Sequence, residues 1–460
     1  MRQFTVKILL ALGLLDRQLL AAEEPLPDDP QIQAALQTCV DQQKRAPGIV
    51  IGVLDDAGAR FYARGARNAG GGDAVDADTV FEIGSITKVF TALLLQDMVD
   101  HGEVKLDDPI SRYLPASVKA PSRDGKEITL LDLATQHSGL PRLPENLSPK
   151  DGANPYADYT VEQLYQFLSG YKLTRDIGAK YEYSNLGVGL LGHLLSLKAG
   201  TNYEALVVNR VCEPLGMRHT RMTLTPELKA RLATGHNKLG LPVANWDIPT
   251  LAGAGALRST AADMVKFLSL SMGKTASPLA EAVAKCEEPR ADAGGTQRIG
   301  LAWHIGSNFQ VTWHNGGTGG YRSYLGFNKA RHRGVVVLGN SENSVDDLGL
   351  YLLGAVKNIE PYSAAKQRQV AKIDHAIYDK YVGSYRFTWL GPYLTVTRDG
   401  DRLLAQLTAQ SAFEVFPESP TDFFYTVVEA QLTFVTNQSG TTTDVILHQN
   451  GRDQKATKVK

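Results

Sequence analysis

The alternation of hydrophobic and polar positions divides the chain into regions of strand and of helix. Near the start, short runs rich in β-branched and aromatic residues predict strands at residues 49–53, 60–63 and 79–83. The period then changes. From Ser85 to His101, apolar residues recur every three or four positions, which predicts a long amphipathic helix that ends at Gly102.

Helical spacing dominates the middle of the chain, and strand patterns return later. The predicted helices are residues 160–168, 186–197 and 261–270. Closely spaced strands are predicted at residues 299–305, 310–314, 323–327 and 334–338, followed by a closing helix at 347–356. Early and late strands with helices between them indicate one sheet built from both ends of this region, with a helical subdomain inserted.

The last part of the chain has a different pattern. After a shift in composition at residues 362–372, apolar and polar residues alternate around turn signals such as Asp399-Gly400, which is typical of a small antiparallel β domain. We therefore expect a large domain over residues 30–360 and a small one over residues 373–460. The predicted fold class is mixed α/β (α+β).

Composition and charge narrow the classes of partner. With 460 residues, of which 43% are hydrophobic and 21% charged, the chain can bury a large core. The formal net charge is -1 and no block of like charges occurs, which argues against nucleic acid and against attachment to anionic lipid. A small molecule or a peptide is the expected partner, and the oligomeric state stays open.

The first residues resemble a secretory signal. Arg2 and Lys7 precede an apolar run, and Ala21 and Ala22 precede an acidic segment with prolines, so we expect a signal over residues 1–22 and export to the periplasm or beyond. The alternative is an ordinary amphipathic start. No later segment approaches the roughly 20 apolar residues that span a bilayer.

The pattern of cysteines and histidines argues against a metal site. Cys39, Cys212 and Cys286 are far apart, which predicts buried thiols or at most one disulfide. Neither HExxH nor a Cys/His ligand cluster occurs. We therefore expect neither a metal nor a cofactor.

Ser85 and Lys88 form an SxxK motif at the start of the predicted helix. Three residues of helix place both side chains on one face, where an amine can take the proton of a hydroxyl. The motif alone is weak evidence, because Ser85 can equally be a plain helix cap. The same spacing recurs at Ser169, Ser271 and Ser363, but only Ser85 opens a long helix directly after a strand and a glycine.

Two further segments carry chemistry. Tyr183 has Asn185 two places on; a phenol becomes a useful proton carrier if a cation such as Lys88 favours its anion, and Asn185 can hold a substrate amide. The alternative is a capping turn before the next helix.

The run from Trp313 to Gly320 holds His314, Gly316 and Gly317, where bare backbone can lie against a substrate and an N–H can serve an oxyanion hole. Other HxG matches, at His137, His304 and His332, are interpreted as ordinary loop or strand histidines.

In this order, SxxK, YxN and HxG resemble the superfamily of class C β-lactamases and low-molecular-mass penicillin-binding proteins. The segments FEIGSITKVFTALLLQ, LDDPISRYLP, ITLLDLATQHSGLP and WHNGGTGGYRS are similar to family segments, and the resemblance covers residues 49–356. It implies a β-lactamase/transpeptidase-like fold, in which an antiparallel sheet flanked by helices lies beside an all-helical subdomain. It also implies that Ser85 is the nucleophile, Lys88 its activator, Tyr183 the acid/base and Asn185 a substrate contact. The N–H groups of Ser85 and Gly317 would form the oxyanion hole.

His314 departs from the family pattern, which usually has lysine there. A permanent cation binds the carboxylate of a β-lactam or of a D-Ala terminus, whereas a histidine with a pKa near 6.5 is charged only part of the time. The resemblance implies a penicillin-interacting hydrolase of β-lactam or D-Ala-D-Ala substrates, most similar to periplasmic DD-carboxypeptidase/endopeptidases. An esterase, a D-amino-acid peptidase and a non-catalytic binder of peptidoglycan remain the alternatives.

Overall fold

The computed structural model describes residues 25–306, 311–362, 370–387, 393–408, 412–425, 430–449 and 452–459. Two compact units, Met1–Tyr362 and Ser363–Lys460, divide the chain. The predicted signal over residues 1–22 and the SxxK match at Ser363 lie outside the described residues.

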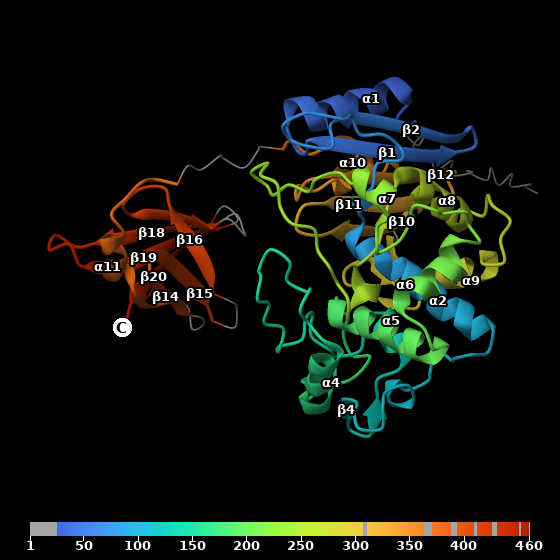
Figure 1. Ribbon diagram of the computed structural model, residues 1–460, viewed down its shortest axis with the longest axis horizontal. Helices are drawn as coiled ribbons and strands as arrows, with labels where there is room; N and C mark the ends of the chain where they lie inside the picture. Colours follow the sequence, from blue (N-terminus) through green and yellow to red (C-terminus); the bar gives the residue numbers. More distant parts are fainter. Residues whose placement is uncertain are drawn as a thin grey trace, which may run out of the picture. The chain divides into compact units, whose positions relative to one another are not determined.

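An eight-stranded antiparallel sheet is the framework of the first unit (Figure 1). Its strand order is β2-β1-β12-β11-β10-β9-β8-β7, so early and late strands pair as the sequence pattern predicted. The strands are β1 (Gly48–Asp55), β2 (Gly58–Gly65), β7 (Ala291–Asp292), β8 (Gln297–Ile299), β9 (His304–Gly306), β10 (Val311–Gly317), β11 (Arg322–Asn328) and β12 (Arg333–Gly339).

Helices cover both faces of this sheet. Ile49 and Ile51 of β1 point to one face and pack in one cluster with residues of α1 (Asp29–Gln37) and α10 (Asp346–Leu352). Val50 points to the other face and belongs to the larger cluster, which includes α8 (Ala261–Ser271). Because successive side chains of a strand point to opposite faces, a strand covered on both sides is apolar at nearly every position.

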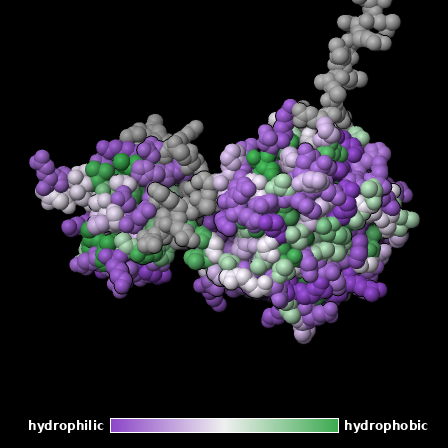
Figure 2. Space-filling view, turned by 90° about the horizontal axis from the view of Figure 1, so that it is seen from above, coloured by the Kyte–Doolittle hydropathy of each residue, from purple (hydrophilic) through white to green (hydrophobic). Residues whose placement is uncertain are grey.

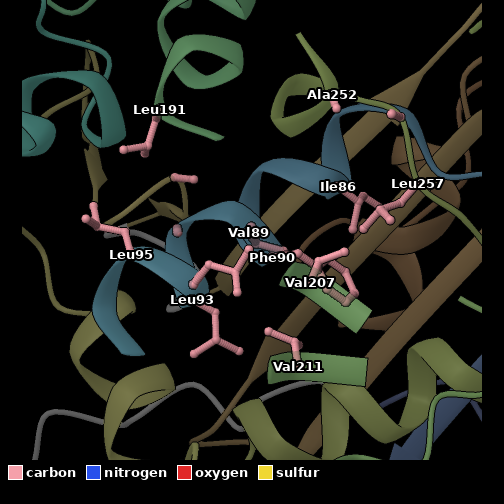
Figure 3. Close-up of a cluster of buried hydrophobic side chains, with 14 of the residues drawn as sticks. Ile86, Val89, Phe90, Leu93, Leu95, Leu191, Val207, Val211, Ala252 and Leu257 are labelled. Atoms are coloured by element: carbon pink, nitrogen blue, oxygen red, sulfur yellow. The ribbon is translucent and has the colours of Figure 1, made fainter. Parts of the chain in front are cut away.

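The helix that follows Ser85 is buried on every side. It is α2 (Thr87–Asp100), and all its residues from Thr87 to Met98 are buried. Figure 3 shows Val89, Phe90 and Leu95 of α2 in one cluster of buried side chains with Leu191 and Val207, which come from neighbouring helices. The prediction of an amphipathic helix is therefore wrong, since a helix covered all round belongs to the core. The other helices of this unit are α3 (Leu130–Ala134), α4 (Val161–Gly170), α5 (Asn185–Ala199), α6 (Tyr203–Val207), α7 (Pro226–Ala230) and α9 (Ala280–Cys286).

Several predicted boundaries differ from the structure. The run at residues 299–305 is two strands, because β8 ends at Ile299, β9 begins at His304, and the turn between them places Ala302 at φ 61°. The strand predicted at 79–83 contracts to β3 (Phe81–Glu82), which pairs with β6 (Arg258–Ser259). The closing helix spans Asp346–Leu352 and stops before Gly354, whose φ is +70°.

The second unit is a closed antiparallel barrel. Its strands are β13 (Gly383–Phe387), β14 (Tyr393–Asp399), β15 (Arg402–Leu407), β16 (Phe413–Pro417), β17 (Asp422–Tyr425), β18 (Ala430–Thr436), β19 (Thr442–Gln449) and β20 (Arg452–Lys458). Pairing of β13 with β20 closes the ring, so no strand edge is left open. Tyr381 of α11 (Tyr378–Tyr381) stacks on Phe434, with ring centroids 4.1 Å apart, in a separate hydrophobic core. The predicted antiparallel β domain is confirmed.

Hydrophilic side chains cover much of the face of the first unit seen in Figure 2. Within the described part of the chain, every helix is too short or too polar to span a lipid bilayer. Cys39, Cys212 and Cys286 are buried free thiols, which agrees with the first of the two alternatives drawn from the sequence.

Candidate active site

Ser85 lies on a tight turn between a strand and the central helix. The turn is a single 3₁₀ turn (Gly84–Ile86) between β3 and α2, and Ser85 is partly exposed. The N-cap position of α2 belongs to Ile86 and has no side-chain hydrogen bond, so Ser85 is not a plain helix cap. Gly84 has φ +49°, and a Cβ there would lie 2.6 Å from the backbone nitrogen of Gly317. A glycine is therefore needed for the turn to pack against β10.

Lys88 is fully buried and donates three hydrogen bonds to neutral groups. Its Nζ lies 2.9 Å from Ser85 Oγ, 2.9 Å from Asn185 Oδ1 and 2.6 Å from the carbonyl oxygen of Ala254. Burial, reinforced by the charge of Arg142, lowers the pKa of Lys88 well below its ordinary value. The amine is therefore able to lose its proton far more easily than an exposed lysine, and it is in contact with the hydroxyl of Ser85.

Tyr183 faces the same pair of side chains. Lys88 Nζ lies 4.9 Å and Arg142 Cζ lies 5.1 Å from the centroid of the Tyr183 ring. Burial raises the pKa of Tyr183, while a hydrogen bond with Ser85 and the charge of Arg142 act in the opposite direction. The pKa of Tyr183 is therefore raised overall, whereas the sequence led us to expect that a neighbouring cation would lower it by favouring the phenolate. Tyr183 is thus a protonated phenol at neutral pH.

Asn185 begins α5 and points its side chain at Lys88. Ser184, between Tyr183 and Asn185, caps α5 because its Oγ accepts a hydrogen bond from the Gly187 N–H. The helix cap that the sequence offered as an alternative is therefore Ser184, and the side chains of Tyr183 and Asn185 are not used for capping. Asn185 Oδ1 accepts from Lys88, and its Nδ2 lies 3.4 Å from the hydroxyl of Tyr156. The oxygen expected to hold a substrate amide is already used to hold Lys88.

His314 lies on β10 next to Tyr183 and is almost completely buried. Its ring centroid lies 6.1 Å from that of Tyr183 and 5.2 Å from that of His304. Nδ1 lies 2.6 Å from the carbonyl oxygen of Asn315, and Nε2 has no hydrogen-bond partner among the described residues. Burial, and then the charges of His304 and Lys88, lower the pKa of His314 well below 6.5. The side chain is therefore neutral at neutral pH, and it does not supply the charge of the family lysine.

Gly316 and Gly317 allow the end of β10 to touch the turn that carries Ser85. A Cβ on Gly316 would lie 2.0 Å from the carbonyl oxygen of Ile83, and Ser323 Oγ donates to that same oxygen at 2.9 Å. Gly317, as noted, packs on Gly84. All seven predicted site residues, Ser85, Lys88, Tyr183, Asn185, His314, Gly316 and Gly317, thus belong to one region of the first unit.

Sequence reasoning missed three side chains of this region. Arg142, in the loop between α3 and α4, stacks on Tyr183, and Tyr156 contacts Asn185. His304 does lie on a strand, as expected, but burial lowers its pKa to about 4, and its ring stacks 6.4 Å from that of Tyr183. Arg142 and Tyr156 carry no spacing signal, so only the fold reveals them, whereas His304 had an HxG match that was interpreted as an ordinary strand histidine. No group of three or more His, Cys, Asp or Glu side chains suited to a metal occurs within the described ranges.

Comparison with known proteins identifies the family of the chain. The family model described as Beta-lactamase matches residues 32–356, and one described as a domain of unknown function (DUF3471) matches residues 367–458. The D-alanyl-D-alanine-carboxypeptidase/endopeptidase AmpH of Escherichia coli K12 is 33% identical over 225 residues, which are 48% of this chain and 57% of that protein. The chain thus spans little more than half the length of AmpH.

Two further relatives are matched over more of their length. A β-lactamase of Pseudomonas fluorescens is 27% identical over 334 residues, which are 65% of this chain and 90% of that protein. A crystal structure from Yersinia pestis, described as a β-lactamase/D-alanine carboxypeptidase, superposes with a TM-score of 0.60 at 26% identity and covers 70% of this chain and 96% of that one. The family match covers most of the chain and every residue of the site, and the chain belongs to the β-lactamase family.

Proposed function

We propose that the protein is an exported serine hydrolase that forms an acyl-enzyme on Ser85 with β-lactam or D-Ala-D-Ala-type amide substrates. One observation carries the proposal: a fully buried amine, Lys88, is hydrogen-bonded at 2.9 Å to the hydroxyl of a partly exposed serine. All acceptors of this amine are neutral, so none of them is a carboxylate that would hold its positive charge. An activated nucleophile needs such an adjacent base.

The proposed reaction starts from the contact between Lys88 and Ser85. Lys88, as the neutral amine, takes the proton of Ser85, and Ser85 Oγ attacks the carbonyl carbon of the substrate. The backbone N–H groups of Ser85 and Gly317 stabilise the oxyanion that forms. Tyr183 gives its proton to the leaving nitrogen and receives one from Lys88, which returns to the neutral amine. Water then hydrolyses the ester on Ser85.

The names of the relatives support this substrate class, since they include a D-alanyl-D-alanine-carboxypeptidase/endopeptidase and a β-lactamase. We further propose that residues 1–22 are a signal, that residues 30–360 are the catalytic domain, and that residues 373–460 are a separate C-terminal domain. An esterase or D-amino-acid peptidase is the second candidate, because the neutral His314 supplies no permanent charge on β10.

Covalent labelling with a fluorescent penicillin tests the nucleophile. We expect labelling of the purified protein and none of Ser85→Ala. Ser169→Ala is the matched control, because Ser169 also has a lysine three places on but lies at the end of α4. Equal labelling of Ser85→Ala and the wild type would contradict the proposal. Hydrolysis of nitrocefin, a D-Ala-D-Ala muropeptide and p-nitrophenyl butyrate in parallel then separates the enzyme classes.

A further inference from the structure

Three basic side chains of this region are not available to a charged substrate. Lys88 has no exposed surface, and its three donors are used. His314 is buried next to Tyr183. Arg322, which pairs with Gly317 across β10 and β11, donates to the carbonyl oxygens of Thr318 and Tyr321, and its charge faces Glu342 and Asp346. Lys88 and His314 are therefore buried away from a ligand, and Arg322 donates to backbone carbonyl oxygens beside two acidic residues.

Arg142 differs from all of them. Its residue is exposed, and its guanidinium carbon lies 5.1 Å from the centroid of the Tyr183 ring. Its charge acts on Lys88, Tyr156 and Tyr181 as well as on Tyr183, which locates it within the same cluster of side chains. Among the described residues, no carboxylate pairs with this guanidinium. The neighbouring Glu182 is paired with Arg175 at 2.7 Å.

The backbone of Arg142 is fixed by hydrogen bonds, and its guanidinium contacts the ring of Tyr183. Its carbonyl oxygen accepts hydrogen bonds from the N–H groups of Asn185 and Leu186, at 3.0 and 3.1 Å. The residue is thereby attached to the first turn of α5, which also carries Asn185. The side chain starts from a fixed point beside Tyr183, so little backbone freedom is lost when a ligand binds it.

We propose that Arg142 binds a carboxylate of the substrate and so selects peptides or β-lactams that carry a free carboxylate near the scissile amide. A guanidinium is permanently charged and binds a carboxylate through two parallel N–H groups, which a neutral imidazole cannot do. This inference rests on the proposed function. In this proposal a loop residue, Arg142, binds the substrate carboxylate, whereas most family members bind it through a lysine at the strand position that His314 occupies here.

Paired substrates that differ only in charge test the proposal. One is an N-acetylated peptide that ends in D-Ala-D-Ala with a free carboxylate, and the other is the same peptide with a C-terminal carboxamide. The readout is the ratio of kcat/KM for the carboxylate to that for the carboxamide. We expect Arg142→Gln to lower this ratio by at least about tenfold, a change equivalent to about 1.4 kcal/mol. Arg142→Lys should retain part of the preference for the carboxylate peptide, because the charge remains but the paired N–H groups are lost.

Lys180→Gln is the matched control, since it removes an exposed cation from the segment just before Tyr183. We expect it to leave the ratio unchanged. Melting temperatures of all variants show whether each is folded, and a ratio is independent of the fraction of active enzyme.

The outcomes separate the two proposals. If Arg142→Gln slows both peptides equally, Arg142 acts on Tyr183 and the carboxylate proposal is overturned, while Ser85 labelling still supports the enzyme. A wild type that prefers the carboxamide would also overturn it. If the wild type is neither labelled by penicillin nor active on either peptide, the proposed function itself fails.

Discussion

Asn185 holds Lys88 through its side-chain oxygen, at 2.9 Å from Nζ, and this contact positions the amine beside Ser85. The amide is neutral, so it orients the amine without stabilising its positive charge as strongly as a carboxylate. Because Lys88 has a pKa well below its ordinary value, the neutral amine is accessible near neutral pH. The identity of residue 185 therefore controls the pH at which the proposed base becomes active.

Replacement of Asn185 should move the acidic limb of the pH profile in a predictable direction. In the proposed mechanism kcat/KM falls when Lys88 is protonated, that is, as pH drops through its pKa. Asn185→Asp places a carboxylate beside the amine, raises the pKa of Lys88, and should move the limb to higher pH by about one unit or more. Asn185→Leu removes an acceptor of the ammonium and should move it to lower pH. Shifts in the same direction for both variants would contradict the role of Lys88 as base.

Burial of His314 predicts that the preference for a carboxylate substrate does not depend on pH near neutrality. If His314 bound a substrate carboxylate as a cation, kcat/KM for that substrate would fall as pH rises through its pKa. Since this pKa lies well below 6.5, the charge is already lost in the neutral range. The ratio of kcat/KM for the carboxylate and carboxamide peptides should therefore stay constant within about twofold from about pH 6 to 8. A tenfold fall across that range would show that His314 titrates there.

The spacing of residues predicted the parts of the site that lie close together in the chain. Ser85 and Lys88 are three positions apart at the start of a helix, so their contact follows from helix geometry. Tyr183 and Asn185 are about a hundred residues away, and only the resemblance to the family joined them to the pair. Arg142 could not be found in this way, because it is a single cation in a loop with prolines on both sides and has no periodic context.

The predicted and observed secondary structure differ at positions where contacts between distant parts of the chain decide which residues are buried and where a strand ends. Apolar residues at helical spacing gave the correct position of α2, but spacing does not reveal that Lys88 and Thr91 on the remaining face are also buried. Each has partners there: Thr91 Oγ1 lies 2.7 Å from the hydroxyl of Tyr203 and 2.8 Å from the carbonyl oxygen of Gly253. Likewise, the turn between β8 and β9 places Ala302, and not a glycine, in the left-handed region, so the residue at that position gave no turn signal, and Gly300 alone did not show that the run divides into two strands.

Gly316 should be essential for the site because of contact with the nucleophile turn. A Cβ at this position would lie 2.0 Å from the carbonyl oxygen of Ile83, which is backbone and cannot move aside easily. Gly316→Ala should therefore slow acylation of Ser85 by about 100-fold or more and lower the melting temperature. Gly170→Ala is the control, since a Cβ there meets nothing within 4 Å. Rapid acylation of Gly316→Ala would show that β10 and the turn need not touch.

A buried acid far from the nucleophile should make stability depend on pH. Glu287 follows α9 with 7% of its side chain exposed, and burial of the carboxyl raises its pKa to about 7 although Lys329 forms an ion pair with it. In the unfolded chain its pKa returns to near 4.5. The folded state thus binds more protons between these two values. The stabilisation is complete below about pH 4.5 and is lost as pH rises through about 7.

Substitution of this acid isolates its contribution. Glu287→Gln removes the titration, so the free energy of unfolding of this variant relative to the wild type should rise by about 1–3 kcal/mol between about pH 5 and 8. Urea denaturation of the full chain at both pH values measures the difference. Glu288→Gln is the matched control, because Glu288 is the next residue along the chain and 62% of its side chain is accessible. If the two variants show the same pH dependence, then burial of Glu287 does not set its pKa, and the ion pair with Lys329 must keep the carboxylate charged in the folded protein.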